Sequence, residues 1–223
     1  MNGPETIGSL GERLLQQQLG TTDRAADFYD RQVHPYLTPA MREFISRQNM
    51  VFLSTADSRG ACDSSFRSGL PGFCISLDDH TLVYPEYRGN GVLASAGNMT
   101  ENPHLGMLFM DFTHDHIGLH VNGTVRLYTD RELRTWYPHL PTDTAPGRQP
   151  HLWVHLTVDE AYVHCSKHIP HLEPAPRPRP AADRQRPKDS AYFTEPAPSQ
   201  QDPDADESDA RLPSWRDRLR LRH

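Results

Sequence analysis

Arg88–Gly91 is the segment of this sequence best suited to hold an anion. Gly89 and Gly91 let the backbone come close to a ligand, and Arg88 adds a planar cation that matches phosphate geometry. A helix that starts here would add free backbone N–H groups and a partial positive charge. The segment therefore predicts an anion site. The alternative is an ordinary surface loop with a solvated arginine, which the spacing alone favours.

The residues after this loop predict a short helix. Asn90–Gly91 can begin it, because an asparagine side chain accepts hydrogen bonds from free N–H groups. Val92, Ala96 and Met99 recur at helical spacing and form its expected buried stripe. Asn102–Pro103 would end it, since proline cannot continue a helix.

Two longer stretches carry a resemblance to a known family. YPEYRGNGVLASAGNMTENPH at 84–104, followed by GMLFMDF at 106–112, is similar to the pyridoxamine 5′-phosphate oxidase-like family of FMN-binding split β-barrels. STADSRGACDSSFRSGLPGF at 54–73 resembles the first hairpin and phosphate-side strand of the same family. The resemblance spans about residues 50–169. It implies a mainly β fold, an antiparallel split β-barrel, and a homodimer with each flavin at the subunit boundary.

A bound FMN needs cations and hydroxyl groups at its phosphate, and apolar walls around its ring. Ser65 and Arg67 lie two residues apart, so they share one face of a strand. The resemblance puts cofactor contacts on Arg67, on the strand end Tyr84–Pro85 and on the loop and helix that follow. It also makes His120 and Trp153 candidates for a site shared with the second chain. The full set of candidate cofactor residues is Ser65, Arg67, Tyr84, Pro85, Arg88, Asn90, Gly91, Ser95, His120 and Trp153.

Three parts of the chain differ in composition. Residues 1–48 predict a helical cover, residues 49–172 the split-barrel flavin-binding domain, and residues 173–223 a Pro-rich, acidic tail. The tail has almost no large aliphatic residues, so it cannot bury enough apolar surface to offset ordering entropy, and disorder is predicted.

Alternating apolar and polar residues, separated by Gly and Asp turns, predict several short strands. Asn122–Gly123 is expected to be a bulge inside one of them, because the alternation continues through it. Thr129 and Glu132 predict a capping box for a short helix at 131–137. The strands are expected at 50–56, 61–67, 73–77, 81–84, 105–112, 118–128, 151–158 and 161–166.

Composition excludes several classes of protein. The net charge of −6, without a basic block, argues against general nucleic-acid binding. No apolar run reaches membrane-spanning length, and the first residues lack the layout of a signal peptide, so a cytoplasmic protein is expected. Three scattered cysteines predict neither a disulfide framework nor a zinc knuckle.

The histidines raise the question of a metal. His151 and His155 are four apart, as are His164 and His168, which on a helix would place each pair at one metal. These segments are predicted strands, in which four residues span about 13 Å, too far for one zinc ion. No metal site is expected, although haem stays open because some related barrels bind it.

No nucleophile with a base and an acid stands out in the sequence, so any catalysis would belong to the cofactor. The expected function is an FMN-binding oxidoreductase acting on an unknown small substrate, with deazaflavin as an alternative cofactor. Pyridoxamine phosphate oxidase activity itself is not expected, because a Pro-rich tail stands where those enzymes carry a segment rich in Arg and Trp. The rival hypothesis is a non-catalytic flavin-, deazaflavin- or haem-binding module that serves as a carrier, sensor or partner protein.

Overall fold

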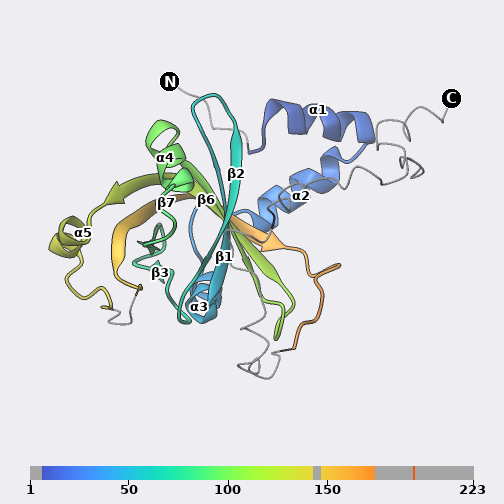
Figure 1. The fold of residues 1–223 in the computed structure, drawn as a ribbon. Helices are drawn as coiled ribbons and strands as arrows, with labels where there is room; N and C mark the ends of the chain where they lie inside the picture. The colour runs from blue at the N-terminus through green and yellow to red at the C-terminus, as the bar shows by residue number, and fades with distance from the viewer. Residues whose placement is uncertain (1–6, 143–146, 174–192, 194–223) are drawn as a thin grey trace, which may run out of the picture. The chain divides into compact units, whose positions relative to one another are not determined.

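Seven strands form one antiparallel sheet in the order β2-β1-β5-β6-β7-β4-β3 (Figure 1). The structure is a computed structural model, and it describes residues 7–142, 147–173 and 193. Residues of β1 and β4, from opposite halves of the sheet, share one hydrophobic core, so the sheet curls around it. The edge strands β2 and β3 do not pair with each other, which leaves the barrel split. The strands are β1 (Met50–Ala56), β2 (Cys62–Ser68), β3 (Ile75–Ser76), β4 (Thr81–Tyr87), β5 (His104–Met110), β6 (Gly118–Tyr128) and β7 (Pro150–His164).

The predicted antiparallel split barrel is confirmed, and two of its strands have the predicted bounds, 50–56 and 118–128. The two strands predicted at 151–158 and 161–166 are instead one strand, β7. Asn122 pairs with Glu160 and Gly123 with Val158, so Asp159 is an extra residue that bends β7 without ending it. The bulge therefore lies opposite the expected position, on the partner strand. Gly123 is required there, because a Cβ would lie 2.0 Å from the Thr157 carbonyl oxygen.

Strand β4 runs three residues further than predicted and includes a proline. Its neighbour β3 pairs only with Leu82 and Val83, so no strand needs the N–H group that Pro85 lacks. The extension carries Glu86 and Tyr87 to the edge of the split, where they line a cavity described below.

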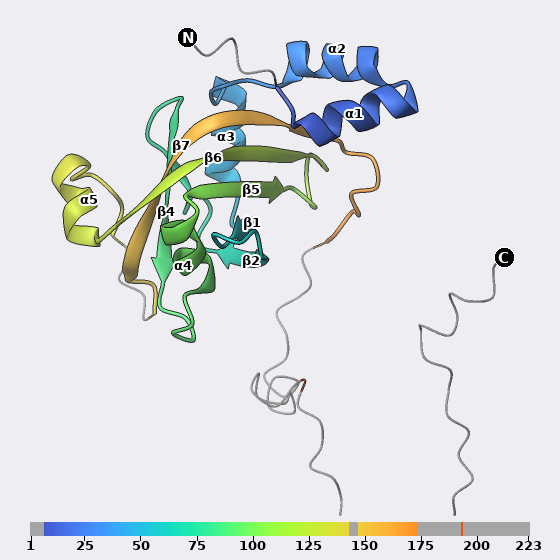
Figure 2. The same ribbon diagram turned by 90° about the horizontal axis from the view of Figure 1, so that it is seen from above.

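In the described part of the chain, five helices accompany the sheet: α1 (Leu10–Leu19), α2 (Thr22–Gln32), α3 (Pro39–Arg47), α4 (Ala94–Glu101) and α5 (Asp130–Trp136). Neither α1 nor α2 has a buried residue, whereas α3 buries Phe44 and Ile45 in the core. Figures 1 and 2 place α5 and the α1–α2 pair at opposite ends of β7. Within the described part of the chain, every helix is too short or too polar to span a bilayer. The predicted tail at 173–223 lies outside the described residues except for Glu173 and Phe193.

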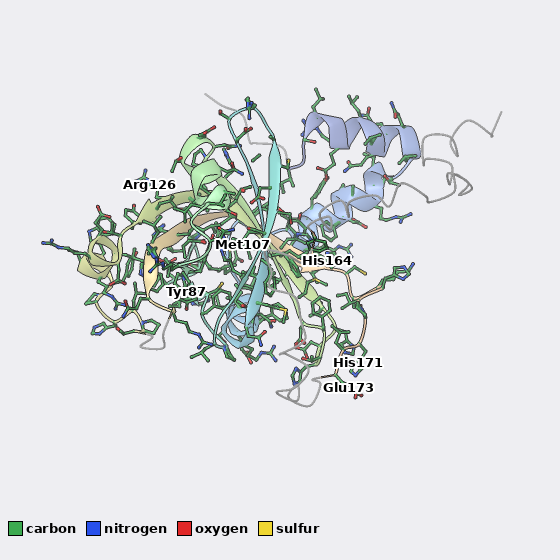
Figure 3. All side chains as sticks on the ribbon, viewed as in Figure 1. Tyr87, Met107, Arg126, His164, His171 and Glu173 are labelled. Carbon is green, nitrogen blue, oxygen red and sulfur yellow. The ribbon has the colours of Figure 1, made fainter. Side chains whose placement is uncertain are left out.

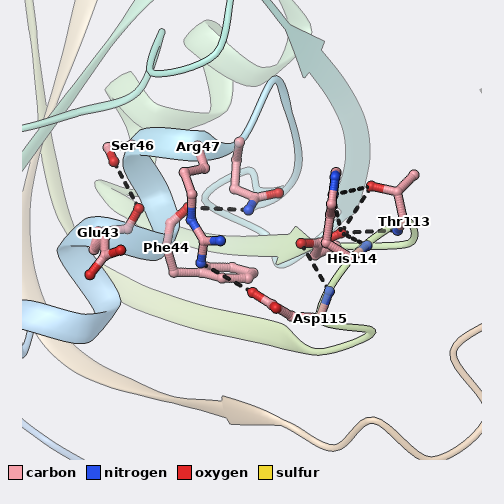
Figure 4. Close-up of polar contacts among 9 residues, drawn as sticks. Glu43, Phe44, Ser46, Arg47, Thr113, His114 and Asp115 are labelled. Atoms are coloured by element: carbon pink, nitrogen blue, oxygen red, sulfur yellow. Dashed lines mark hydrogen bonds and ion pairs between the residues drawn. The ribbon is translucent and has the colours of Figure 1, made fainter.

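The turn between β5 and β6 is built around one carboxylate. Asp111 accepts hydrogen bonds from the backbone N–H groups of Thr113 and His114 at 2.9 Å each, and of Asp115 at 3.4 Å. Burial raises the pKa of Asp111, but these backbone hydrogen bonds outweigh it and lower the pKa to about 2. Arg47 of α3 donates to Asp115 at 3.1 Å, so the turn also holds α3 (Figure 4).

Candidate functional site

A cavity of about 430 Å³ lies between β2, the end of β4 and the loop that leads into α4. Two larger hollows, of about 920 and 1080 Å³, contain none of the candidate cofactor residues. The smaller cavity brings six of those ten residues together. They are Ser65, Arg67, Arg88, Asn90, Gly91 and Ser95.

Strand β2 forms one wall of the cavity, because every second side chain along the strand faces the cavity. Asp63, Ser65 and Arg67 share one face, and Phe66 points to the other. Strand β2 pairs only with β1, so its other edge is left open beside the cavity. Ser65 and Arg67 were predicted from this spacing, and Asp63, which the same alternation indicates, was not predicted.

Arg67 is engaged by a carboxylate from the other side of the split. Its Nε lies 3.0 Å from Glu86 Oε2 and its Nη2 lies 2.9 Å from Glu86 Oε1, a two-pronged ion pair between β2 and β4. Its Nη1 donates to the Phe66 carbonyl oxygen at 3.0 Å. The two side chains are 20% and 9% exposed, so water weakens the pair only partly. Sequence reasoning missed Glu86, although it lies two residues after Tyr84 on the same strand face.

The loop after β4 begins its helix later than predicted. Helix α4 starts at Ala94, and Val92, expected in the buried stripe, is 71% exposed. The prediction was wrong because Asn90 uses its Oδ1 to accept the Val92 N–H at 3.0 Å, which closes a turn in place of a helix cap. Leu93 then adopts a left-handed conformation with φ of 54°. Ala96 and Met99 are buried and Asn102 ends the helix, as predicted.

The start of α4 is open to an anion. No side chain caps it, and the first backbone hydrogen bond into it joins the Gly97 N–H to the Leu93 oxygen at 2.8 Å. The N–H groups of the preceding turn, residues 94–96, are therefore left for a ligand or solvent. Ala94 and Ser95 line the cavity at this point.

Three oxygen-bearing side chains form a chain along one wall. Ser95, only 3% exposed, donates its hydroxyl hydrogen to Asp63 Oδ2 at 3.0 Å. Its Oγ also lies 2.8 Å from the Ser65 Oγ. This contact ties the start of α4 to β2.

Three candidate residues on β4 and β7 lie away from the cavity. Tyr84 is fully buried in the core, where its hydroxyl has no hydrogen-bond partner among the described residues and burial raises its pKa well above the usual value. Pro85 pairs with Trp153 on the opposite face of the sheet. Trp153 is 2% exposed, packs in a second cluster that contains Val83, and donates its Nε1–H to Asp130 at 2.8 Å.

His120 also lies away from the cavity, on the outer face of β6. Its ring stacks on Tyr162 with centroids 4.6 Å apart, and its Nε2 lies 2.9 Å from His164 Nδ1. Burial and the neighbouring His164 lower the pKa of His120. Figure 3 shows His164 well separated from Tyr87, which lines the cavity. Among the described residues, no group of three or more His, Cys, Asp or Glu could hold a metal ion.

Solved structures resemble this chain at low identity. HupZ of Group A Streptococcus is 18% identical over 56% of this chain and 92% of its own, with a TM-score of 0.41. An FMN-binding protein from Syntrophomonas wolfei is 12% identical over 70% and 98%, with a TM-score of 0.39. An F420 reductase is 15% identical over 54% and 94%, with a TM-score of 0.38. At these scores the similarities carry no functional argument.

Family assignment rests on a family model. No curated protein matches the chain. The model described as pyridoxamine 5′-phosphate oxidase matches residues 37–165, which is more than half of the chain and includes every residue that lines the cavity. The chain belongs to the pyridoxamine 5′-phosphate oxidase family.

Proposed function

We propose that this protein binds FMN, or a deazaflavin in its place, at the cavity between β2 and β4, and that it acts as a flavin-dependent oxidoreductase on a small molecule. The observation that carries the proposal is the meeting of Arg67, Arg88 and the uncapped start of α4 around one cavity. Two cations and free backbone N–H groups are what a phosphate requires. Membership of the family supports a flavin as the molecule that bears it.

In this proposal the flavin supplies the electron or hydride transfer, and the protein binds and orients it. Arg88 is exposed and stands beside Gly89–Gly91, so it can close on the phosphate. Arg67 adds charge from the opposite wall while Glu86 fixes its orientation. The residues present therefore fit a phosphorylated cofactor.

We also propose that the protein is a homodimer. One row crosses the outer face of the sheet from Phe66 to Phe52, Leu108, His120 and Tyr162, each paired with the next. Phe52 and Phe66 are 37% and 50% exposed, with ring centroids 5.4 Å apart. Neighbouring exposed aromatic rings on a sheet face favour burial against a second chain.

Sedimentation of the full chain tests the dimer. The double substitution Phe52→Ser and Phe66→Ser should convert the dimer to a monomer, whereas Leu10→Ser on exposed α1 should not. A wild-type chain that sediments as a monomer would rule the dimer out.

Flavin binding is tested with arginine variants. Arg67→Ala and Arg88→Ala should each weaken FMN binding, because a charge-assisted hydrogen bond contributes about 1.5–3 kcal/mol. Arg59→Ala is the matched control, since Arg59 is 84% exposed on a hairpin turn and pairs with Asp57. Failure of the wild-type protein to take up FMN or deazaflavin would refute the proposal.

Turnover is a separate measurement. A bound flavin that is bleached by a reduced nicotinamide and recovers in air supports the oxidoreductase. A bound flavin whose colour no such reductant changes would assign the protein to the non-catalytic carriers or sensors instead.

A further inference from the structure

The hydroxyl groups of Ser65 and Ser95 have fixed hydrogen-bond directions. A serine hydroxyl has a single hydrogen to donate and two lone pairs that accept. Ser95 gives its hydrogen to Asp63 Oδ2, which can only accept as a carboxylate. In the 2.8 Å contact between the two hydroxyls, Ser65 must therefore be the donor. Both hydrogens point along the chain toward Asp63, and Ser65 keeps only lone pairs for the cavity.

The neighbouring ion pair limits what Arg67 can offer a ligand. Each of its three guanidinium nitrogens already makes a hydrogen bond, two to Glu86 and one to the Phe66 carbonyl oxygen, so only the second N–H of Nη1 and of Nη2 is left. Apart from those two groups, this wall of the cavity presents acceptors: Asp63, Ser65 and Glu86. Most donors lie on the other wall, where Arg88 and the N–H groups at the start of α4 are found.

This division separates two parts of a ligand. A phosphate group accepts hydrogen bonds and is repelled by carboxylates, so it belongs at the donor wall. A chain of alcohol groups can donate to serine and carboxylate oxygens, so it belongs at the acceptor wall. Ser95 is 3% exposed and holds the Asp63–Ser95–Ser65 chain together, which makes this wall a formed part of the structure.

We propose that Asp63, Ser95 and Ser65 form a subsite for the hydroxyl groups of a polyol, which in a flavin is the ribityl chain. The inference rests on the proposed function and deepens it. It assigns Ser65 and Ser95, which the sequence predicted only as cofactor residues, to the sugar alcohol and not to the phosphate. Asp63 acts as a positioning residue, because it sets the direction of both hydroxyl groups.

Three ligands of increasing size test the subsite at one pH. Lumichrome carries the ring alone, riboflavin adds the ribityl chain, and FMN adds the phosphate. Dissociation constants are measured by flavin fluorescence for the full-length wild type, Ser65→Ala and Asp63→Asn. Ser64→Ala is the matched control, because Ser64 is an exposed residue on the opposite face of β2.

Ser65→Ala should reduce the preference for riboflavin over lumichrome by roughly tenfold, as for the loss of one or two hydrogen bonds. The preference for FMN over riboflavin should stay unchanged. Asp63→Asn should lower the first preference and raise the second, because it removes a negative charge and lets the asparagine N–H reverse the serine hydroxyls. Unchanged lumichrome affinity in both variants shows that the ring site is intact.

The opposite pattern overturns the inference. If Ser65→Ala lowers the preference for FMN over riboflavin and leaves riboflavin over lumichrome unchanged, the serines serve the phosphate, while the proposed function still stands. If the wild type binds none of the three ligands, the proposed function fails and the subsite fails with it.

Discussion

The turn after β5 and the loop before α4 both present backbone N–H groups, and of these two only the turn after β5 supplies its own anion. In the turn after β5, the Asp111 carboxylate accepts hydrogen bonds from the N–H groups of residues 113–115. In the loop before α4, Asn90 accepts a single hydrogen bond, from Val92, and no side chain caps the helix. The first loop satisfies its N–H groups within the chain, whereas the N–H groups at the start of α4 are left for a ligand or solvent.

This difference distinguishes a structural turn, the one after β5, from a candidate binding loop, the one before α4. The Asp111 turn has a buried acceptor and also holds α3 through the ion pair between Arg47 and Asp115. The loop before α4 exposes Val92 and Leu93 and holds Leu93 at positive φ, which costs energy for a branched side chain. The turn after β5 also holds a residue, His116, at positive φ, so backbone strain does not distinguish the two loops, whereas the uncapped N–H groups before α4 do.

The largest expected effect comes from removing the internal anion. Asp111→Ala should lower the free energy of unfolding by about 2–3 kcal/mol, because three backbone N–H groups lose a buried acceptor. Urea unfolding of the full chain measures it. Asp115→Ala is the control and should cost less than about 1 kcal/mol, since its ion pair with Arg47 is half exposed. Equal losses in the two variants would contradict this ranking of the contacts.

Lowering the pH should remove the stabilisation that the Asp111 carboxylate gives the wild-type protein. The pKa of Asp111 falls from 3.8 to about 2 on folding, so its stabilisation is full above about pH 3.8 and is lost as the pH falls through 2. The amount is up to about 2 kcal/mol. The stability difference between wild type and Asp111→Asn should therefore shrink between pH 4 and pH 2. A difference that stays constant across this range would show that the charge of Asp111 does not stabilise the turn.

A third loop, before α5, can also be compared with the loop before α4, and the expected change in stability is smaller than for Asp111. Thr129 accepts the Glu132 N–H at 3.3 Å, and Glu132 accepts the Thr129 N–H at 2.8 Å, which forms the predicted capping box. Thr129→Ala should cost about 1 kcal/mol, the usual value for a lost cap, as measured by thermal unfolding. FMN affinity should not change, because this helix lies outside the cavity. A drop in FMN affinity would mean that the two helix starts are coupled.

The elements that were predicted well from the sequence are those determined by residues close together in the chain. Strand 118–128 follows from strict alternation, and the α5 capping box follows from Thr129 and Glu132 three residues apart. Strand β7 was predicted as two strands, at 151–158 and 161–166, with Asp159–Glu160 between them. Its continuity depends on pairing with β6 on one side and β4 on the other, which is information from distant residues.

Single residues of the candidate site could be predicted from the sequence, whereas the contacts that fix their positions could not. Arg88 was predicted from its type and its glycine neighbours, and Arg67 was predicted from the family resemblance together with its strand spacing from Ser65; both line the cavity. The ion pair of Arg67 with Glu86 could not be found that way, because it joins strands that meet only when the sheet curls. The late start of α4 was missed because Asn90 has two uses, a helix cap or a turn, and only the folded loop decides between them.

The smallest change in stability should come from giving the loop before α4 an anion of its own. Val92 is 71% exposed, so Val92→Asp should alter the free energy of unfolding by no more than about 0.5 kcal/mol. The new carboxylate would stand at the helix start that the phosphate is proposed to use, so FMN affinity should fall roughly tenfold while riboflavin affinity stays unchanged. Val92→Asn has the same shape without the charge and should bind FMN normally. If Val92→Asp binds FMN as tightly as the wild type, the phosphate lies elsewhere, and the contrast between the two loops would not explain where the ligand binds.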